Sequence, residues 1–421
     1  MERYSEYKDS GVQWLGEIPG HWKTVRVKAL LSERVDKSDT GLEEPLSMSQ
    51  KYGIIPTREM DVVPNMASTY IGAKRVFKQD LVFNKLKAHL GVFAISKYDG
   101  LVSPDYAVYT PNERTYLPFM EYVFHTPLYI GEFTRKATGV AIGLTRLYTN
   151  GLFAVPFLYP PLSEQHSIVS YLDDKCGKID KMLEGKQKQI ELLAEMKQRI
   201  IADAVTRGLN PDVKMKATNI PWLPEIPEHW DVKRGKNLFN KEQRPIEEGD
   251  EIVTCFRDGE VTLRKNRRTT GFTEATDYSH YQHICKGDLV IHQMDAFAGS
   301  SGVSDSDGMG TPVLSVCTAR IEGVNHYYFA YILRLMGKNN FILSLYRGIR
   351  ERSSDFRFET FAKLYLPVPP AIEQEQIVKF IHERSSKIDT LTSKLQQEIE
   401  SIKEYKQRLI SDVVTGQIKV C

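Results

Sequence analysis

The sequence has no long apolar run of the kind that a membrane-spanning helix needs. Nowhere among its 421 residues does an apolar stretch approach the length of about 18–20 residues that would span a bilayer. The first ten residues, MERYSEYKDS, also lack the basic-then-apolar pattern of a secretory signal peptide. We therefore expect a cytoplasmic protein that does not bind a membrane.

Cysteine is scarce, and no two cysteines form a C-x-x-C pair. The five cysteines are odd in number and widely spaced, which is typical of reduced thiols and not of a disulfide framework. The one segment that looks like a set of metal ligands is His280-x-x-His283-x-Cys285. Because zinc sites usually need four ligands, with a second pair at a defined spacing, we interpret this segment as a polar cluster and expect no metal.

An excess of charge of one sign is also missing. The chain has 56 Lys and Arg residues against 54 Asp and Glu residues, for a net charge of +2. Any affinity for nucleic acid must therefore come from local patches. An aromatic content of 10% together with this low net charge argues against disorder. At roughly 100–200 residues per domain, the length of the chain predicts two or more compact domains.

Motifs of common nucleotide-dependent enzymes are absent as well. The sequence contains no G-x-x-x-x-G-K-[ST] phosphate-binding loop, and no G-x-G-x-x-G opens a helix after a strand. The segment Asn210-Pro211-Asp212 lacks the aromatic residue with which an amino-methyltransferase would stack a flipped base. No arrangement of serine, cysteine and histidine for nucleophilic catalysis stands out. We therefore expect neither catalysis nor a bound cofactor.

What the chain does contain is an internal duplication. All four tryptophans fall in two matching segments, WLGEIPGHW and WLPEIPEHW, which begin 208 residues apart at Trp14 and Trp222. Further segments match at an offset of 208 or 209: Lys78-x-Asp80-Leu81-Val82 with Lys286-x-Asp288-Leu289-Val290, Asp99-Gly100 with Asp307-Gly308, and Pro160-Pro161-x-x-Glu164-Gln165 with Pro369-Pro370-x-x-Glu373-Gln374. Shared composition does not produce matched tryptophans, so we interpret the chain as two copies of one unit.

Each copy is expected to have a globular part followed by a helical part. This divides the chain into residues 1–159, 160–209, 210–368 and 369–421. The globular parts are rich in β-branched and aromatic residues. Short runs such as 288–291 and 314–317 suit strands, whereas 117–133 and 326–346 suit short helices. The fold class is therefore mixed α+β, and the pattern does not give its topology.

The helical part of each copy follows a Pro-Pro pair and contains no internal proline. Residues at seven-residue spacing form the pattern of a coiled-coil seam in both helices. The seam positions are Leu172, Ile179, Lys186, Leu193 and Ile200 in the first helix, and Ile381, Ile388, Leu395, Ile402 and Leu409 in the second. Antiparallel pairing is favoured, since it would relate the two copies by a pseudo-two-fold axis, but parallel pairing stays open.

Basic residues in both globular parts are interleaved with Tyr, His, Gln and Asn. The run Arg264-Lys265-Asn266-Arg267-Arg268 has no acidic residue between positions 261 and 270. Such stretches suit phosphate anchoring and the reading of base edges, although a single charge run is usually a solvated surface. Because both copies have them, we predict a nucleic-acid ligand with these candidate contacts: Lys51, Arg58, Lys85, Lys87, His89, Arg135, Lys136, Arg146, Arg264, Lys265, Arg267, Arg268, His292, Gln293, Arg350 and Arg357.

Three features together resemble the specificity subunit of type I restriction–modification systems. They are the paired Ile-Pro-x-His-Trp segments (18–22 and 226–230), the paired Pro-Pro-x-x-Glu-Gln segments that enter the helices, and the half-length duplication. The stretch from Asp80 to His89, followed by residues 98–106, is similar to a recurring type of target recognition domain. The resemblance covers almost the whole chain.

This resemblance implies a non-catalytic subunit with two target recognition domains, each reading one half of a bipartite, asymmetric DNA site. The two helices would form an antiparallel coiled coil that separates the domains, fixes the spacing of the half-sites and docks two methyltransferase subunits. Those subunits would carry S-adenosylmethionine, and a translocating nuclease subunit can join them. Because the loops of the two copies differ, the two half-sequences should differ, and no individual base-reading residue is implied.

Two other functions stay open on the residues alone. A stand-alone DNA methyltransferase or endonuclease with an unrecognised active site would methylate or cut DNA by itself. A coiled-coil adaptor that binds only protein would show no salt-dependent binding to DNA.

Overall fold

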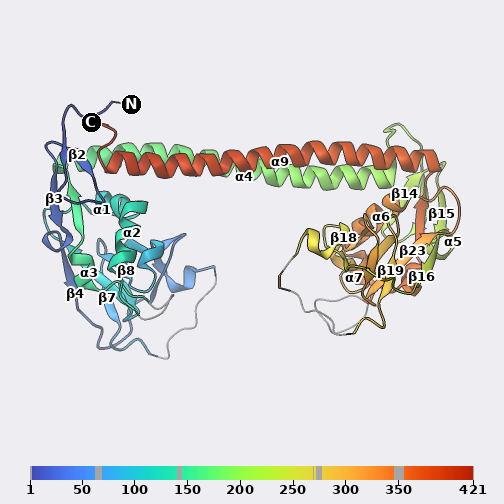
Figure 1. The fold of residues 1–421 in the computed structure, drawn as a ribbon, viewed down its shortest axis with the longest axis horizontal. Helices are drawn as coiled ribbons and strands as arrows, with labels where there is room; N and C mark the ends of the chain where they lie inside the picture. The colour runs from blue at the N-terminus through green and yellow to red at the C-terminus, as the bar shows by residue number, and fades with distance from the viewer. Residues whose placement is uncertain are drawn as a thin grey trace. The chain divides into compact units, whose positions relative to one another are not determined.

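The computed structural model of this chain describes residues 2–61, 69–139, 145–268, 270–271, 277–345 and 355–420. The chain forms two compact units. Met1–Gln187 together with Gln396–Cys421 is the first unit, and Lys188–Leu395 is the second. Each unit combines a globular part with a portion of both long helices (Figure 1).

The first unit is built on an antiparallel four-stranded sheet in the order β4-β11-β8-β9. Short antiparallel pairs surround it: β1 with β2, β3 with β12, β5 with β6, and β7 with β10. The strands are β1 (Tyr7–Asp9), β2 (Glu17–Pro19), β3 (Lys23–Arg26), β4 (Leu31–Arg34), β5 (Leu46–Ser49), β6 (Gly53–Pro56), β7 (Lys74–Val76), β8 (Leu81–Asn84), β9 (Phe93–Ile95), β10 (Gly100–Val102), β11 (Tyr106–Pro111) and β12 (Pro156–Tyr159).

The central strand β8 of the first unit is buried on both faces, which explains its continuous apolar run. Successive side chains of a strand point to opposite faces. Leu81 and Phe83 accordingly belong to a large core, whereas Val82 belongs to a smaller one. The large core includes residues of helices α1 (Leu117–Phe124), α2 (Pro127–Lys136) and α3 (Thr149–Phe153). Three 3-10 turns, η1 (Val27–Ala29), η2 (Thr57–Glu59) and η3 (Ala88–Leu90), connect the strands.

The second unit repeats this topology with the sheet order β16-β23-β20-β21. Its strands are β13 (Met215–Ile220), β14 (Leu223–Pro227), β15 (Asp231–Arg234), β16 (Phe239–Glu242), β17 (Val253–Cys255), β18 (Val261–Leu263), β19 (Gln282–Ile284), β20 (Leu289–His292), β21 (Ser301–Val303), β22 (Gly308–Gly310), β23 (Leu314–Ala319) and β24 (Tyr365–Val368). Helices α5 (Gly235–Leu238), α6 (His326–Lys338), α7 (Phe341–Ser344) and α8 (Phe358–Phe361), with turns η4 (Arg264–Asn266) and η5 (Ala296–Ala298), complete it. The shared strand order confirms the duplication and the mixed α+β class.

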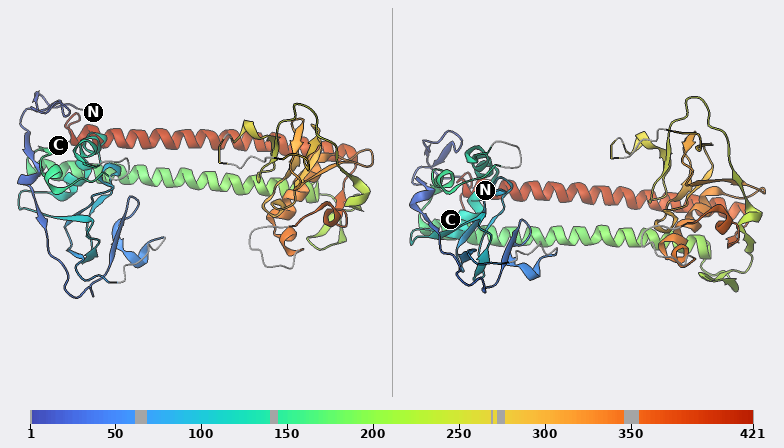
Figure 2. Two further views of the ribbon diagram at one scale, coloured as in Figure 1. Left: turned by 60° about the horizontal axis from the view of Figure 1, so that its bottom comes forward. Right: turned by 90° about the horizontal axis from the view of Figure 1, so that it is seen from below.

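Two long helices, α4 (Leu162–Arg207) and α9 (Ala371–Val414), pack together. In the first unit Lys406 Nζ lies 2.6 Å from Asp180 Oδ1, and Lys186 pairs with Glu398. Residue numbers therefore rise along one helix as they fall along the other, so the pairing is antiparallel (Figure 2). Lys197 and Asp389 make the corresponding contact at 2.7 Å in the second unit. No helix within the described ranges combines the length and the apolarity needed to cross a bilayer.

The seam positions lie on the covered side of these helices. Leu172, Ile381, Ile388, Leu395 and Leu409 are buried, and Ile179, Leu193, Ile200 and Ile402 are half-buried. Lys186 takes the seam position between Ile179 and Leu193, where its ammonium group reaches Glu398. A long lysine side chain can cover apolar surface with its methylene groups while its charge stays near water.

The repeated Trp and Pro-Pro-x-x-Glu-Gln segments meet within each unit. Trp22 and Trp230 are fully buried. The histidine before each tryptophan contacts the glutamate of the helix start, with His21 Nε2 2.8 Å from Glu164 Oε2 and His229 Nε2 2.7 Å from Glu373 Oε2. This contact fastens the first turn of each long helix to the globular part. The repeated motifs are therefore structural.

Candidate nucleic-acid interface

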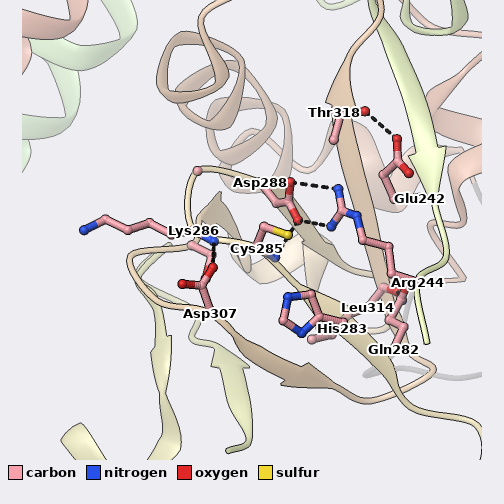
Figure 3. Close-up of polar contacts among 12 residues, drawn as sticks. Glu242, Arg244, Gln282, His283, Cys285, Lys286, Asp288, Asp307, Leu314 and Thr318 are labelled. Atoms are coloured by element: carbon pink, nitrogen blue, oxygen red, sulfur yellow. Dashed lines mark hydrogen bonds and ion pairs between the residues drawn. The ribbon is translucent and has the colours of Figure 1, made fainter. Parts of the chain in front are cut away.

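Each unit holds a buried Asp–Arg ion pair directly before the central strand of its sheet. Asp80 is 2% exposed and accepts hydrogen bonds from Arg34 Nε at 2.9 Å and Nη2 at 3.1 Å. Asp288 likewise accepts from Arg244 Nη1 at 2.6 Å and Nη2 at 3.3 Å (Figure 3). The aspartate of the repeated Lys-x-Asp-Leu-Val segment is thus neutralised by an arginine. It positions the start of β8 or β20 and has no free carboxylate for catalysis.

Two lysines of the first unit are anchored on one turn, residues 103–106. Lys74, on β7, donates from Nζ to the carbonyl oxygen of Tyr106 at 2.8 Å. Lys85, which directly follows β8, donates to the carbonyl oxygen of Pro104 at 3.2 Å. The Lys74 side chain is only 12% exposed, whereas Lys85 is half-buried. We call Lys74 and Lys85 the lysine pair.

The lysine pair lies in a locally positive environment. Burial is the main cause that lowers the pKa of Lys74, and repulsion by the positive charge of Lys85 lowers it further. Glu33 opposes this effect from 3.8 Å. Arg146 adds another cation beside the same turn, with its Nη2 3.5 Å from Asp105 Oδ1. A group of cations around a backbone turn is suited to phosphate oxygens and to acceptor atoms on bases.

The second unit has glutamines where the first has the lysine pair. Gln282 on β19, at the position of Lys74, donates from Nε2 to the carbonyl oxygen of Leu314 at 2.8 Å. Gln293, at the position of Lys85, donates from Nε2 to the carbonyl oxygen of Pro312 at 3.4 Å and to Ser315 Oγ at 3.2 Å. Leu314 and Pro312 are the counterparts of Tyr106 and Pro104 at the offset of 208. We call Gln282 and Gln293 the glutamine pair. The two units therefore hold different side chains on the same backbone acceptors.

Positions next to these pairs also differ between the units. Asn84, the last residue of β8, corresponds to His292, whose pKa is lowered mainly by burial, so that its ring is neutral near pH 7. The exposed Lys87 corresponds to Asp295, which binds Arg257 at 2.9 Å. The end of the central strand thus carries an excess of positive charge in the first unit and mostly neutral polar groups in the second.

The other candidate contacts of the first unit lie at separate places, and several already have acidic partners. Lys51 lies 3.1 Å from Asp61, and Arg58 pairs with Glu44. Arg135 donates to both carboxylate oxygens of the buried Glu132 at 2.7 Å. Lys136 is the half-buried last residue of α2, and His89 lies in η3.

The basic run of the second unit lies at η4 and just after it, where acidic residues from other segments approach it. Lys265 pairs with Glu251, and Arg267 lies 2.7 Å from Asp258 and 2.8 Å from Glu260. Two candidates remain beside them: Arg264 is half-buried within η4, and Arg268 donates to the carbonyl oxygens of Thr270 and Gly271. Elsewhere in the unit Arg357 pairs with Asp355 at 2.8 Å, whereas Arg350 lies outside the described residues.

Sequence reasoning did not include Lys74 or Gln282 among the candidate contacts, although Lys85 and Gln293 were both named. The missing signal was the combination of the 208-residue offset with the strand register. β7 pairs with β10 as β19 pairs with β22, and this places positions 74 and 282 beside the same kind of turn. Lys37, whose charge acts on Lys74, was also missed.

Comparisons with known proteins agree with this architecture. Residues 227–401 match the family model of the type I restriction modification DNA specificity domain. The MjaX type I restriction enzyme specificity subunit of Methanocaldococcus jannaschii is 21% identical over 431 residues, covering 96% of each chain. The EcoBI specificity subunit of Escherichia coli is 21% identical over 279 residues, covering 62% of this chain and 57% of its own.

Solved structures share the fold at low sequence identity. A chain from a structure of a type I R-M system, determined to explain its assembly and conformational transition, has a TM-score of 0.69 at 15% identity and covers 95% of this chain and 99% of its own. The HsdS subunit of Thermoanaerobacter tengcongensis has a TM-score of 0.54 at 15% identity, with coverages of 95% and 98%. The family match, the relatives and the fold together support the assignment of this chain to the specificity subunits of type I restriction–modification systems.

Proposed function

We propose that this chain recognises DNA within a type I restriction–modification complex, and that each globular part reads one half of a bipartite, asymmetric site. The chain itself catalyses no reaction and binds no cofactor. Two methyltransferase subunits dock on it and supply S-adenosylmethionine, and a translocating nuclease subunit can join them. The helices α4 and α9 set the spacing between the half-sites.

The observation that carries this proposal is the contrast between the lysine pair and the glutamine pair. Both pairs are anchored on equivalent carbonyl oxygens, so the two units present a side chain at the same place in the same fold. Lysine suits phosphate oxygens and the acceptor atoms of guanine, whereas glutamine can pair with the donor and acceptor edge of adenine. A duplicated scaffold with different chemistry at one position suits a protein that reads two different half-sequences.

Accessibility assigns separate roles to the members of each pair. Lys74 and Gln282 are largely buried and hold the turn. Lys85 and Gln293 are half-buried and lie at the end of the central strand. An ammonium group has three donors, so Lys85 can keep its bond to Pro104 and still donate to DNA. Lys85 and Gln293 are thus the proposed DNA contacts of the two units.

The long helices support the docking of protein partners. Several apolar side chains are about half exposed on them, which is unfavourable in water and typical of a surface that binds another protein. These are Met182, Leu192, Met196, Leu391 and Tyr405, with exposures of 54%, 53%, 53%, 46% and 51%. The methyltransferase subunits are the partners proposed to cover them.

Reciprocal substitutions in the assembled methyltransferase complex test the reading roles. Lys85→Gln should reduce methylation at sites with the native first half-sequence by about 10- to 100-fold, since a good base contact contributes roughly 1–3 kcal/mol of discrimination. Gln293→Lys should act in the same way on the other half-sequence alone. Genome-wide mapping of methylated adenines measures both effects, with Lys8→Gln on the exposed strand β1 as the matched control. If either variant altered both half-sequences, independent reading would be wrong.

The non-catalytic role has its own test. The purified chain alone should incorporate no methyl group from S-adenosylmethionine into DNA and should cut no DNA. Activity that copurifies with the chain through several columns would support a stand-alone enzyme. If the complex bound DNA without any salt dependence, a protein-only adaptor would be favoured instead.

A further inference from the structure

Three side chains that can bind a metal ion converge in the second unit, away from the basic residues described above. Within the described part of the chain, His283, Cys285 and Asp307 each offer a ligand atom, and these atoms lie within 4.8 Å of one another. Residues 283 and 285 are two apart along β19, so their side chains share one face. Asp307 directly precedes β22, whose Gly308 pairs with Ile284. The strand pairing therefore brings Asp307 next to Cys285 (Figure 3).

A neighbouring carboxylate orients the histidine. His283 is 6% exposed, and its Nδ1 lies 2.9 and 3.1 Å from the two carboxylate oxygens of Asp250. A proton on Nδ1 that is donated to Asp250 leaves the lone pair on Nε2. Histidines that bind metals characteristically donate their other nitrogen to a carboxylate in this way. The same carboxylate also accepts the backbone N–H of Glu247 at 2.9 Å, which holds the 247–250 loop beside the ring.

We propose that His283, Cys285 and Asp307 bind a zinc ion. A thiolate and an imidazole favour Zn²⁺ over Mg²⁺ or Ca²⁺, which prefer oxygen ligands. With bonds of about 2.0–2.3 Å, the ligand atoms of a tetrahedral site lie roughly 3.3–3.8 Å apart, so a shift of about 1 Å closes the site. The fourth ligand is Glu247, whose Oε1 lies 3.9 Å from His283 Nε2, or a water molecule.

The surroundings of the site are compatible with a cation. Arg244 is the positive charge that acts on Cys285, and its ion pair with Asp288 neutralises it. Asp288 also accepts the backbone N–H of Cys285 at 2.8 Å, which fixes the main chain at this ligand. Asp307 is exposed and Cys285 is partly exposed, so an ion can reach the site from solvent.

The first unit provides an internal comparison. At the offset of 208, His283 corresponds to Arg75, Cys285 to Phe77 and Asp307 to Asp99. The two aspartates share a structural role, since each accepts the backbone N–H of a lysine, at 2.8 Å from Lys286 and 2.7 Å from Lys78.

The other two positions differ in kind. Arg75 forms ion pairs with Glu43 at 2.9 Å and Asp36 at 3.3 Å, and Phe77 packs under Arg34, whose guanidinium carbon lies 4.7 Å from the ring centroid. Neither side chain can bind zinc. The metal-binding residues have thus replaced an ion pair and a packing residue in one copy of the fold, which confines the proposed site to the second unit.

The zinc content of the full chain tests the proposal. The protein, reduced and freed of metal by a chelator, is incubated with zinc chloride and dialysed, and zinc per chain is measured by mass spectrometry. We expect one zinc ion per chain in the wild type and none in Cys285→Ser or His283→Gln. Cobalt in place of zinc should give a thiolate-to-cobalt charge-transfer absorption that Cys285→Ser abolishes.

The first unit and a distant thiol supply the controls. Asp99→Asn and Cys176→Ser should keep one zinc ion per chain. The double variant His283→Arg with Cys285→Phe, which restores the residues of the first unit, should fold normally by circular dichroism and bind no zinc. If the wild type binds no zinc, or if zinc persists in Cys285→Ser and His283→Gln, the proposal is wrong. Neither result bears on the DNA-reading role of Lys85 and Gln293.

Discussion

The buried ion pair of each unit offers a sharp test of what stabilises the fold. Asp80 accepts two hydrogen bonds from Arg34 and one from the backbone of Phe77 while being 2% exposed. Asp80→Asn keeps the shape of the side chain but removes its charge and places an amide donor against donors. Removing one partner of a buried pair costs roughly 3–5 kcal/mol. Because the Arg34 side chain is 26% exposed and can be partly hydrated, we expect a loss of about 3 kcal/mol.

Differential scanning calorimetry measures this loss as a shift of the unfolding temperature. For a unit of 150–250 residues each kcal/mol lowers Tm by about 2–4 °C, so the transition of the first unit should fall by about 6–12 °C. Asp288→Asn should lower the transition of the second unit by a similar amount, since Arg244 is also 26% exposed. Transition temperatures are compared here because a chain with two units need not unfold in one step.

An apolar replacement separates the charge from the packing. Asp80→Leu combined with Arg34→Met removes both charges, and such replacements of buried pairs are often neutral or stabilising. The double variant should therefore unfold well above Asp80→Asn. A shift of less than about 2 °C in Asp80→Asn, or a double variant less stable than the single one, would refute the role assigned to this ion pair.

Three further predictions concern DNA. Replacing Arg264, Lys265, Arg267 and Arg268 together with alanine should flatten the salt dependence of DNA binding by the complex; because Lys265 and Arg267 already have acidic partners, we expect the slope of log affinity against log salt to fall by about 2, at 0.9 for each phosphate contact, and an unchanged slope would show a solvated surface. Exchanging residues 22–155 for another recognition domain should change one half-sequence in methylome maps and leave the other intact. Inserting four residues after Glu184 and four after Ser393 lengthens each helix by about 6 Å with a rotation of about 400°, so the seam is largely kept; the unspecified gap should grow by about one to two base pairs at 3.4 Å each, and an unchanged gap with full activity would mean that the helices do not measure the DNA.

The sequence alone determined the features that depend on repetition and on local periodicity. Matched tryptophans at Trp14 and Trp222 revealed the duplication, which the shared strand order confirms. Seven-residue spacing revealed the two long helices, because a helix places residues seven apart on one face whatever surrounds it. Their antiparallel pairing, favoured over parallel at the sequence stage of reasoning, is confirmed by the ion pairs of Asp180 and Glu398. The division into residues 1–159, 160–209, 210–368 and 369–421 stays a prediction.

Only the tertiary structure decided which side chains meet. The run around Arg267 has no acidic residue near it in the sequence, yet Asp258 and Glu260 approach it in space because β17 (Val253–Cys255) and β18 (Val261–Leu263) pair. Lys74 and Lys85 share a turn only because strand pairing brings β7 and β8 to residues 103–106. His283 and Cys285 were visible as a motif, but Asp307, 22 residues beyond Cys285, joined them through the pairing of β19 with β22. Sheet register is set by contacts between segments distant in the sequence, and local patterns do not contain that information.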